Sequence, residues 1–210
     1  MLRYIIREEH RSIRTEDYVR DFVDVPKFLE FCRACPRHDQ TWACPEFDFD
    51  PLDIWASHRW FHLNARVMEF TPDQPRTGLS REELLDDVTT MFHREKRQAH
   101  RELVALHRRV AHSTPLSAGA CELCEECTRA EGKPCRIPDQ LFHSIESLGG
   151  DVSATMTRLF GHPVQWSDGT SLPDSYLLVT GLLCDSEHIP LMQAPGAAPA
   201  PSGEAVNSSI

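Results

Sequence analysis

The sequence has no apolar run long enough to cross a bilayer, and it has no excess of basic residues. Its 210 residues include 22 lysines and arginines against 32 aspartates and glutamates, a formal net charge of −10. An acidic surface repels phosphate backbones, which argues against general nucleic-acid binding. The opening segment, MLRYIIREEH, is too highly charged for a signal peptide. We therefore expect a cytoplasmic protein that binds neither nucleic acid nor membranes.

Three common functional motifs are also missing. The sequence contains no Gly-x-Gly-x-x-Gly, no P-loop and no Gly-x-Ser-x-Gly. Nucleotide binding and serine-hydrolase chemistry therefore have no support, because these glycine-rich turns cradle phosphates and expose the serine nucleophile. Hydrophobic residues make up 40% and charged residues 26%, the balance of a folded globular protein. We expect one metal-binding domain over residues 1–192 and a disordered tail over residues 193–210, where little is available to pack.

Hydrophobic patterning predicts an α+β fold: a small mixed sheet of three or four strands, one long helix and two cysteine-rich loops. The expected strands cover residues 2–6, 63–70 and 176–183. The expected shorter helices cover residues 15–23, with Thr15 as its cap, residues 26–32, and residues 151–160, with Asp151 as its cap. The expected loops cover residues 33–53 and 115–138.

The long helix has the clearest signal. Ser80-x-x-Glu83 forms a capping box before apolar residues at helical spacing, which predicts a helix of about 30 residues. We interpret its basic side, which includes Lys96, as a solvated face. His93, His100 and His107 recur every seven residues, too far apart for a single ion. We interpret them as a solvated or partner-facing edge.

The most informative feature is the set of eight cysteines, seven of which fall in two tight clusters. In a reducing compartment disulfides are rare, so clustered thiols indicate a metal site. The first cluster is Cys-x2-Cys-x8-Cys and the second is Cys-x2-Cys-x2-Cys-x7-Cys. Their members are Cys32, Cys35 and Cys44 in the first, and Cys121, Cys124, Cys127 and Cys135 in the second. Cys184 stands alone.

The second cluster favours a [4Fe-4S] centre over zinc. Three cysteines at steps of three residues can offer one thiolate to each of several neighbouring irons, and Cys135 can return as the fourth ligand. Ferredoxin loops use the same steps with a shorter last gap. Structural zinc usually takes two separated Cys-x2-Cys pairs, which this cluster fits less well. Zinc remains the alternative.

The first cluster has only three local thiols. A four-iron cluster held there has one iron without a cysteine, which is either open to a small substrate as a Lewis acid or completed by another group. The candidates for that group are Cys184, His38, Asp39 and Glu46. The alternative is a purely structural zinc site bound by these three cysteines and His38.

Taken together, these motifs resemble those of the bacterial and archaeal predicted metal-binding proteins, domain-of-unknown-function family 2284. The matching segments are Cys32-x-x-Cys35-Pro36, Trp42-x-Cys44-Pro45, Ala118-Gly119-x-Cys121-x-x-Cys124-x-x-Cys127 and Gly132-x-Pro134-Cys135-Arg136-x-Pro138. The stretch from Ser144 to Val152 is similar as well. Where the family tends to have Cys-Pro-Pro, this chain has Glu46 after Pro45. The resemblance implies metal binding but no settled reaction.

The function predicted is that of a protein with two [4Fe-4S] clusters. The second cluster, fully ligated by cysteine, would relay electrons, and the first would bind a small substrate at an open iron. One alternative is a pure electron-transfer partner protein with Cys184 as the eighth ligand. The other is a zinc-stabilised interaction module. The expected partners are a small-molecule substrate or a redox partner protein.

Overall fold

The computed structural model describes residues 2–44, 46–78, 80–167 and 169–190. The predicted disordered tail, residues 193–210, lies outside these residues. The described elements are β1 (Tyr4–Arg14), α1 (Thr15–Phe22), α2 (Val25–Ala34), α3 (Pro51–Ala56), β2 (Trp60–Phe70), α4 (Arg81–Arg109), β3 (Thr114–Leu116), η1 (Thr128–Glu131), η2 (Pro138–Gln140), η3 (Glu146–Leu148), α5 (Val152–Ala154), η4 (Thr155–Phe160) and β4 (Ser175–Cys184). None of the described helices is both long and apolar enough to span a membrane.

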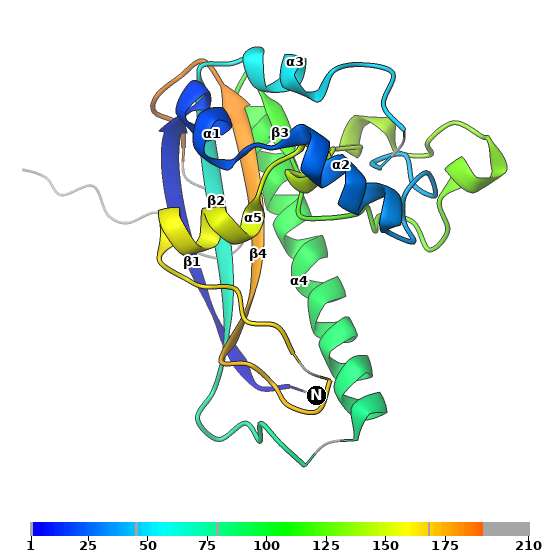
Figure 1. The fold of residues 1–210 in the computed structure, drawn as a ribbon, viewed down its shortest axis with the longest axis vertical. Coiled ribbons are helices and arrows are strands. Elements are labelled where there is room, and N and C mark those ends of the chain that lie inside the picture. The colour runs from blue at the N-terminus through cyan, green and yellow to red at the C-terminus, as the bar shows by residue number, and fades with distance from the viewer. Residues whose placement is uncertain (1, 45, 79, 168, 191–210) are drawn as a thin grey trace, which may run out of the picture.

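Within the described chain, four strands form one sheet in the order β1-β2-β4-β3 (Figure 1). The predicted α+β class, with one long helix, is confirmed. The three pairings in this sheet are antiparallel, so the sheet is not mixed. β1 continues well past the predicted residues 2–6, because it pairs residue by residue with β2 along its whole length. Hydrophobic patterning did not predict this extension, because the added residues are mostly charged and are exposed or partly exposed.

Two of the three predicted helix caps form. The capping box of α4 forms: the Ser80 hydroxyl accepts from the Glu83 amide at 3.2 Å, and the Glu83 carboxylate accepts from the Ser80 amide at 3.0 Å. Asp151 caps α5 by accepting from the Ala154 amide at 2.7 Å. Thr15 makes no cap, because α1 begins at this residue and Arg14 takes the preceding position.

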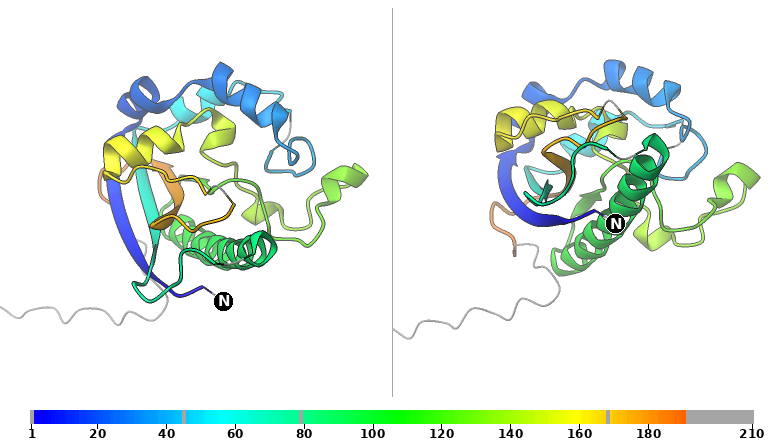
Figure 2. Two further views of the ribbon diagram at one scale, coloured as in Figure 1. Left: turned by 60° about the horizontal axis from the view of Figure 1, so that its bottom comes forward. Right: turned by 90° about the horizontal axis from the view of Figure 1, so that it is seen from below.

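Helices cover both faces of the sheet (Figures 1 and 2). On one face α1, α3, η3 and η4 pack a core with the odd-numbered apolar residues of β2. Within this core Tyr18, Trp55 and Phe61 have ring centroids about 5 Å apart, and the Trp55 indole donates to the carbonyl of Leu148 at 2.8 Å. η3 is therefore fastened to the core, which matters for the site below.

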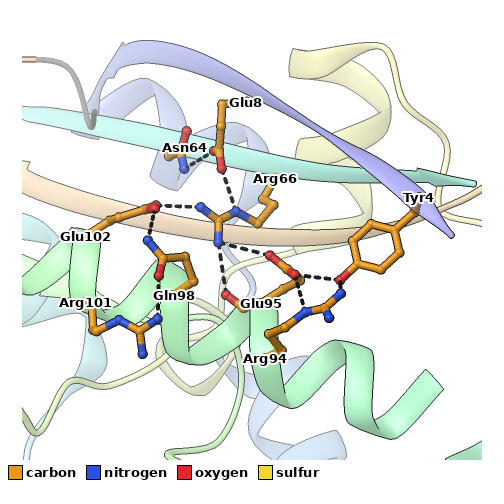
Figure 3. A network of polar contacts seen from close by, with 9 residues as sticks. All are labelled: Tyr4, Glu8, Asn64, Arg66, Arg94, Glu95, Gln98, Arg101 and Glu102. Carbon is orange, nitrogen blue, oxygen red and sulfur yellow. Dashed lines mark hydrogen bonds and ion pairs between the residues drawn. The ribbon is translucent and has the colours of Figure 1, made fainter. Parts of the chain in front are cut away.

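The opposite face of the sheet meets α4 partly through charge (Figure 3). The side chain of Arg66 on β2 is 4% exposed and contacts three carboxylates, those of Glu8, Glu95 and Glu102, the first at 2.5 Å and the last at 2.6 Å. Tyr4 donates to Glu95 at 2.6 Å. A buried guanidinium needs such partners, since an unpaired charge is costly to remove from water. The network fixes where α4 lies against the sheet.

Candidate metal centre

The two cysteine-bearing loops lie side by side at one end of the molecule (Figures 1 and 2). The first follows α2 and the second follows β3. The Trp42 indole donates to the carbonyl of Lys133 at 3.0 Å, and the Arg129 Nε donates to Asp39 at 2.9 Å. The Arg129 guanidinium also stacks over the Trp42 ring at 4.6 Å. The fold thus brings together two clusters that are far apart in sequence.

The first loop presents Cys32, Cys35 and Cys44 from the C-terminal end of α2 and the turn that follows. The Cys35 amide donates to the carbonyl of Cys32 at 3.0 Å, which ends the helix, and the Asp39 amide donates to the carbonyl of Cys44 at 2.8 Å. Burial, and then the nearby Cys44 and Glu146, raises the pKa of Cys32 to about 11. Burial also raises the pKa of Cys44, and Cys35 adds to that effect. The three thiols therefore lie within electrostatic range of one another.

The second loop presents Cys121, Cys124, Cys127 and Cys135. Burial raises the pKa of Cys121, and the other three thiols add to the effect, so these four also lie near one another. Backbone and polar contacts shape the loop. The Thr128 hydroxyl donates to the carbonyl of Pro134 at 2.8 Å, and Arg136 donates to the carbonyl of Glu126 at 2.7 Å. Within residues 121–135, all of them described, Thr128 is the one buried residue.

The thiols are near one another without forming a single-ion site. In the described part of the chain, no group of three or more His, Cys, Asp or Glu side chains is arranged to hold one metal ion. His38, the fourth ligand in the zinc alternative, contacts Glu46 at 3.3 Å. A cubane cluster takes one thiolate per iron, so it spaces its cysteines more widely than a tetrahedral ion does.

The four candidates for a further ligand at the first cluster each have another partner. His38 and Glu46 contact each other, and Glu46 also pairs with Arg33 at 3.1 Å. Asp39 pairs with Arg129, which lowers its pKa. Cys184 is buried in the apolar cluster between β4 and α4, where its thiol donates to the carbonyl of Ser186 at 3.4 Å. The structure does not bring Cys184 to the first loop.

Two residues at the centre escaped the sequence analysis. Lys96, predicted to lie on a solvated face, has a side chain only 17% exposed. Its ammonium donates to the carbonyl of Ala120 at 3.0 Å and to Glu122 at 2.6 Å. Its positive charge also acts to lower the pKa of Cys44, against the larger effect of burial. The second is Glu146, whose carboxyl lies close enough to Cys32 and Cys44 to raise the pKa of both.

The histidines of α4, predicted to form a solvated or partner-facing edge, also contact other parts of the chain. His93 contacts Glu122 at 2.6 Å, and His100 stacks on Phe142 with ring centroids 5.0 Å apart. His107 contacts Ser113 at 2.9 Å. Glu122 belongs to the second loop, whereas Ser113 and Phe142 lie on either side of it. All three rings thus have partners within the chain, although the His93 side chain is 40% exposed. The seven-residue spacing placed them on one side of the helix but could not show what covers that side.

Comparison with known proteins supports the metal-centre assignment. A family model described as "Predicted metal-binding protein (DUF2284)" matches residues 18–184, which confirms the resemblance carried by the cysteine motifs. No curated protein and no solved structure matches the chain. The matched range contains both cysteine loops, α4 and Glu146.

Proposed function

Since the chain belongs to the DUF2284 family of predicted metal-binding proteins, we propose that it is an iron–sulfur protein that holds two [4Fe-4S] clusters. The observation behind this proposal is the pairing of two separate thiol groups on two loops in mutual contact. A single structural zinc site needs four ligands, whereas seven clustered cysteines supply nearly twice that number. Two clusters in one end of the molecule account for all seven.

The donor sets fit iron–sulfur chemistry at both loops. Cys121, Cys124, Cys127 and Cys135 provide four thiols for the second cluster, and its loop has almost no core of its own to shape it. Cys32, Cys35 and Cys44 provide three for the first. Bound clusters supply one-electron transfer and, at an iron without a thiolate, a position for a small ligand.

The remaining residues of the centre position and shield these donors. The Trp42 ring lies between the two loops under the Arg129 guanidinium. Phe47 packs edge-on and Phe49 packs at a tilt against His143, whose Nδ1 contacts the carbonyl of Ala43 at 3.1 Å. These rings limit water around the first site. Lys96 places a positive charge between the loops, where it offsets the negative charge of the thiolates.

The proposed division of work follows from how each loop is attached to the core. The second loop projects from the sheet and contains one buried residue, Thr128, which leaves room for a redox partner protein to approach. The first loop is joined to the core through Ala43 and the neighbouring Phe47 and Phe49, and its exposed Cys35 gives a small sulfur-containing or carboxylated substrate access to the site. A pure electron carrier is the second candidate, and it would need no such substrate site.

Anaerobic purification tests the proposal. We expect a brown protein with broad absorption near about 400 nm and about eight irons and eight sulfides per chain. Cys184→Ser serves as the matched control, because that thiol lies apart from both loops and its loss should leave the iron count unchanged. A colourless protein that contains stoichiometric zinc and no iron would overturn the assignment.

A further inference from the structure

One carboxyl group beside the first cysteine loop has an oxygen that the described structure leaves unused. The Oε2 atom of Glu146 is buried and has no hydrogen-bond partner among the described residues. Burial raises the pKa of this carboxyl. Buried polar atoms are paired in almost all cases, so an exception calls for a specific explanation, and an ion is one of the established ones.

The rest of this carboxyl group is held in place. Hydrogen bonds from its own backbone, from the Ser144 side chain and from the Gly119 backbone act against burial and lower the pKa of this carboxyl, and Lys96 lies within electrostatic range. Three segments thus converge on one side chain: the residues just before η3, the approach to the second loop, and α4. This arrangement orients the carboxyl group while Oε2 stays free.

The backbone that carries Glu146 is equally well fixed. The flanking side chains of Ile145 and Leu148 are fully buried in the core. The Ser147 amide donates to the Ser144 hydroxyl at 3.1 Å, which shapes the turn. The Asp24 amide donates to the carbonyl of Gly149 at 2.8 Å, which joins the start of α2 to the end of this turn.

The turn brings Glu146 against the first cluster. The thiol of Cys32 approaches the carbonyl of Glu146 at 4.0 Å, although 114 residues separate the two in sequence. The negative charge of the carboxyl group contributes to raising the pKa of Cys32 and of Cys44, so it lies within electrostatic range of both thiols. A fixed, buried carboxyl with one unpaired oxygen therefore stands beside a set of three thiols that lacks a fourth member.

We propose that Glu146 is the fourth ligand of the first metal site and that its Oε2 occupies the position which Cys32, Cys35 and Cys44 leave open. This inference rests on the proposed function. It replaces the four candidates suggested by the sequence with a residue on η3. It also means that the site is closed at rest.

A carboxylate ligand gives the site a way to admit substrate. Carboxylate oxygen is a hard donor, which iron–sulfur iron binds less firmly than thiolate sulfur. With a cluster bound, a small thiol or carboxylate would take the place of Glu146 by ligand exchange, and the released carboxylate would stay in its pocket. No electron is transferred in this exchange.

Replacement of Glu146 tests the proposal through metal content and spectra. Glu146→Gln keeps the shape of the side chain but removes its anionic oxygen donor, so we expect the first cluster to lose one iron per chain. Electron paramagnetic resonance of the oxidised variant should then show a three-iron cluster. Glu146→Cys should retain the full iron count and should lower the midpoint potential of the first cluster, since thiolate donates more electron density than carboxylate.

Glu122→Gln is the matched control, because Glu122 also pairs with Lys96 yet its oxygens are already partnered. It should leave the first cluster with all its iron. An unchanged iron count and spectrum in Glu146→Gln would overturn the ligand assignment, and so would loss of the whole first cluster in both Glu146→Gln and Glu146→Cys. If the wild-type protein contains no iron, the proposed function itself is wrong. That outcome is seen in the wild-type protein alone and is therefore distinct from failure of the ligand assignment.

Discussion

The two cysteine loops differ in how much of the protein holds them. The first loop has exposed residues such as Cys35 but is tied to the core nearby: Ala43 is fully buried, and Phe47 and Phe49 pack against the main apolar cluster. The second loop, residues 121–135, stands away from the sheet (Figure 1) and contains a single buried residue, Thr128. The first site is therefore shaped by the fold, whereas the second depends on what binds to it.

This difference matches the two proposed roles. A site that binds substrate needs ligands held on rigid elements, because small displacements alter the geometry at the reacting atom. An electron relay tolerates a looser frame. When a metal organises a loop with little core, its binding free energy is also the folding free energy of that loop. The predictions below test this contrast.

The largest effect is expected from loss of a ligand in the second loop. Cys124→Ser should lower the iron content and should make residues 121–135 sensitive to protease, because the metal is the main organising contact there. Cys35→Ser, the matching change in the first loop, should also lose iron but should leave its own loop protected. Limited proteolysis with mass spectrometry distinguishes the two. A Cys124→Ser protein with full metal and a protected loop would contradict the four-ligand assignment.

Two glycines with positive φ sharpen the same contrast. Gly149 (φ +88°) ends η3, and a Cβ there would lie 2.7 Å from the Cα of Val25 on α2. Gly149→Ala should therefore lower the free energy of unfolding by about 2–4 kcal/mol through backbone strain and overpacking. It should also reduce iron at the first site, since Glu146 lies on the same turn.

Gly132 (φ +66°) is the matched position in the second loop, where a Cβ would meet nothing within 4 Å. Gly132→Ala should lower the free energy of unfolding by only about 1 kcal/mol, the cost of the left-handed conformation alone. Chemical denaturation of both variants, followed by circular dichroism, gives the comparison. Equal losses would show that η3 and the second loop are fixed to the same degree.

The sequence predicted the parts of this protein that local chemistry determines. The Ser80–Glu83 box and the Asp151 cap each need only residues within one turn, and both form. The spacing of the cysteines identified both loops for the same reason. β3 was missed because three residues that include Pro115 carry no periodic signal.

Glu146 and Lys96 could not be found in this way, because their roles depend on tertiary contacts. Lys96 looks like any lysine on the polar side of a helix, and only the packing of the second loop against α4 buries it. Glu146 approaches Cys32 because α2 and η3 are joined through Asp24 and Gly149. The stretch from Ser144 to Val152 was seen to resemble the family, but nothing in the sequence indicated which cysteine cluster Glu146 would approach.

Thiol reactivity in the metal-free protein is expected to show a smaller, measurable difference. Burial raises the pKa of Cys32 to about 11, whereas Cys35 is exposed. At neutral pH the Cys32 thiolate should be about 100-fold scarcer than that of an ordinary cysteine. Its alkylation should therefore be slow and should accelerate as the pH rises toward about 11. Mass spectrometry after a short pulse of iodoacetamide measures this.

Denaturant provides the control for that measurement. Unfolding removes the burial that protects Cys32, so Cys32 and Cys35 should then react at similar rates. Rapid alkylation of Cys32 in the native metal-free protein would mean that the first loop is not preorganised. It would remove the difference between the two loops on which the proposed roles depend.

The smallest effect is expected where the two loops touch. Arg129 pairs with Asp39, lowers its pKa, and stacks over Trp42. Arg129→Gln removes both the charge and the cation–π contact, and Arg129→Lys keeps the charge but loses the planar stacking. Both variants should retain all their iron. If the ion pair contributes, the deficit of Arg129→Gln in thermal unfolding should shrink in 1 M salt, about the concentration that screens an exposed pair. A deficit that is equal in the two variants and independent of salt would instead assign the contact between the loops to stacking on Trp42.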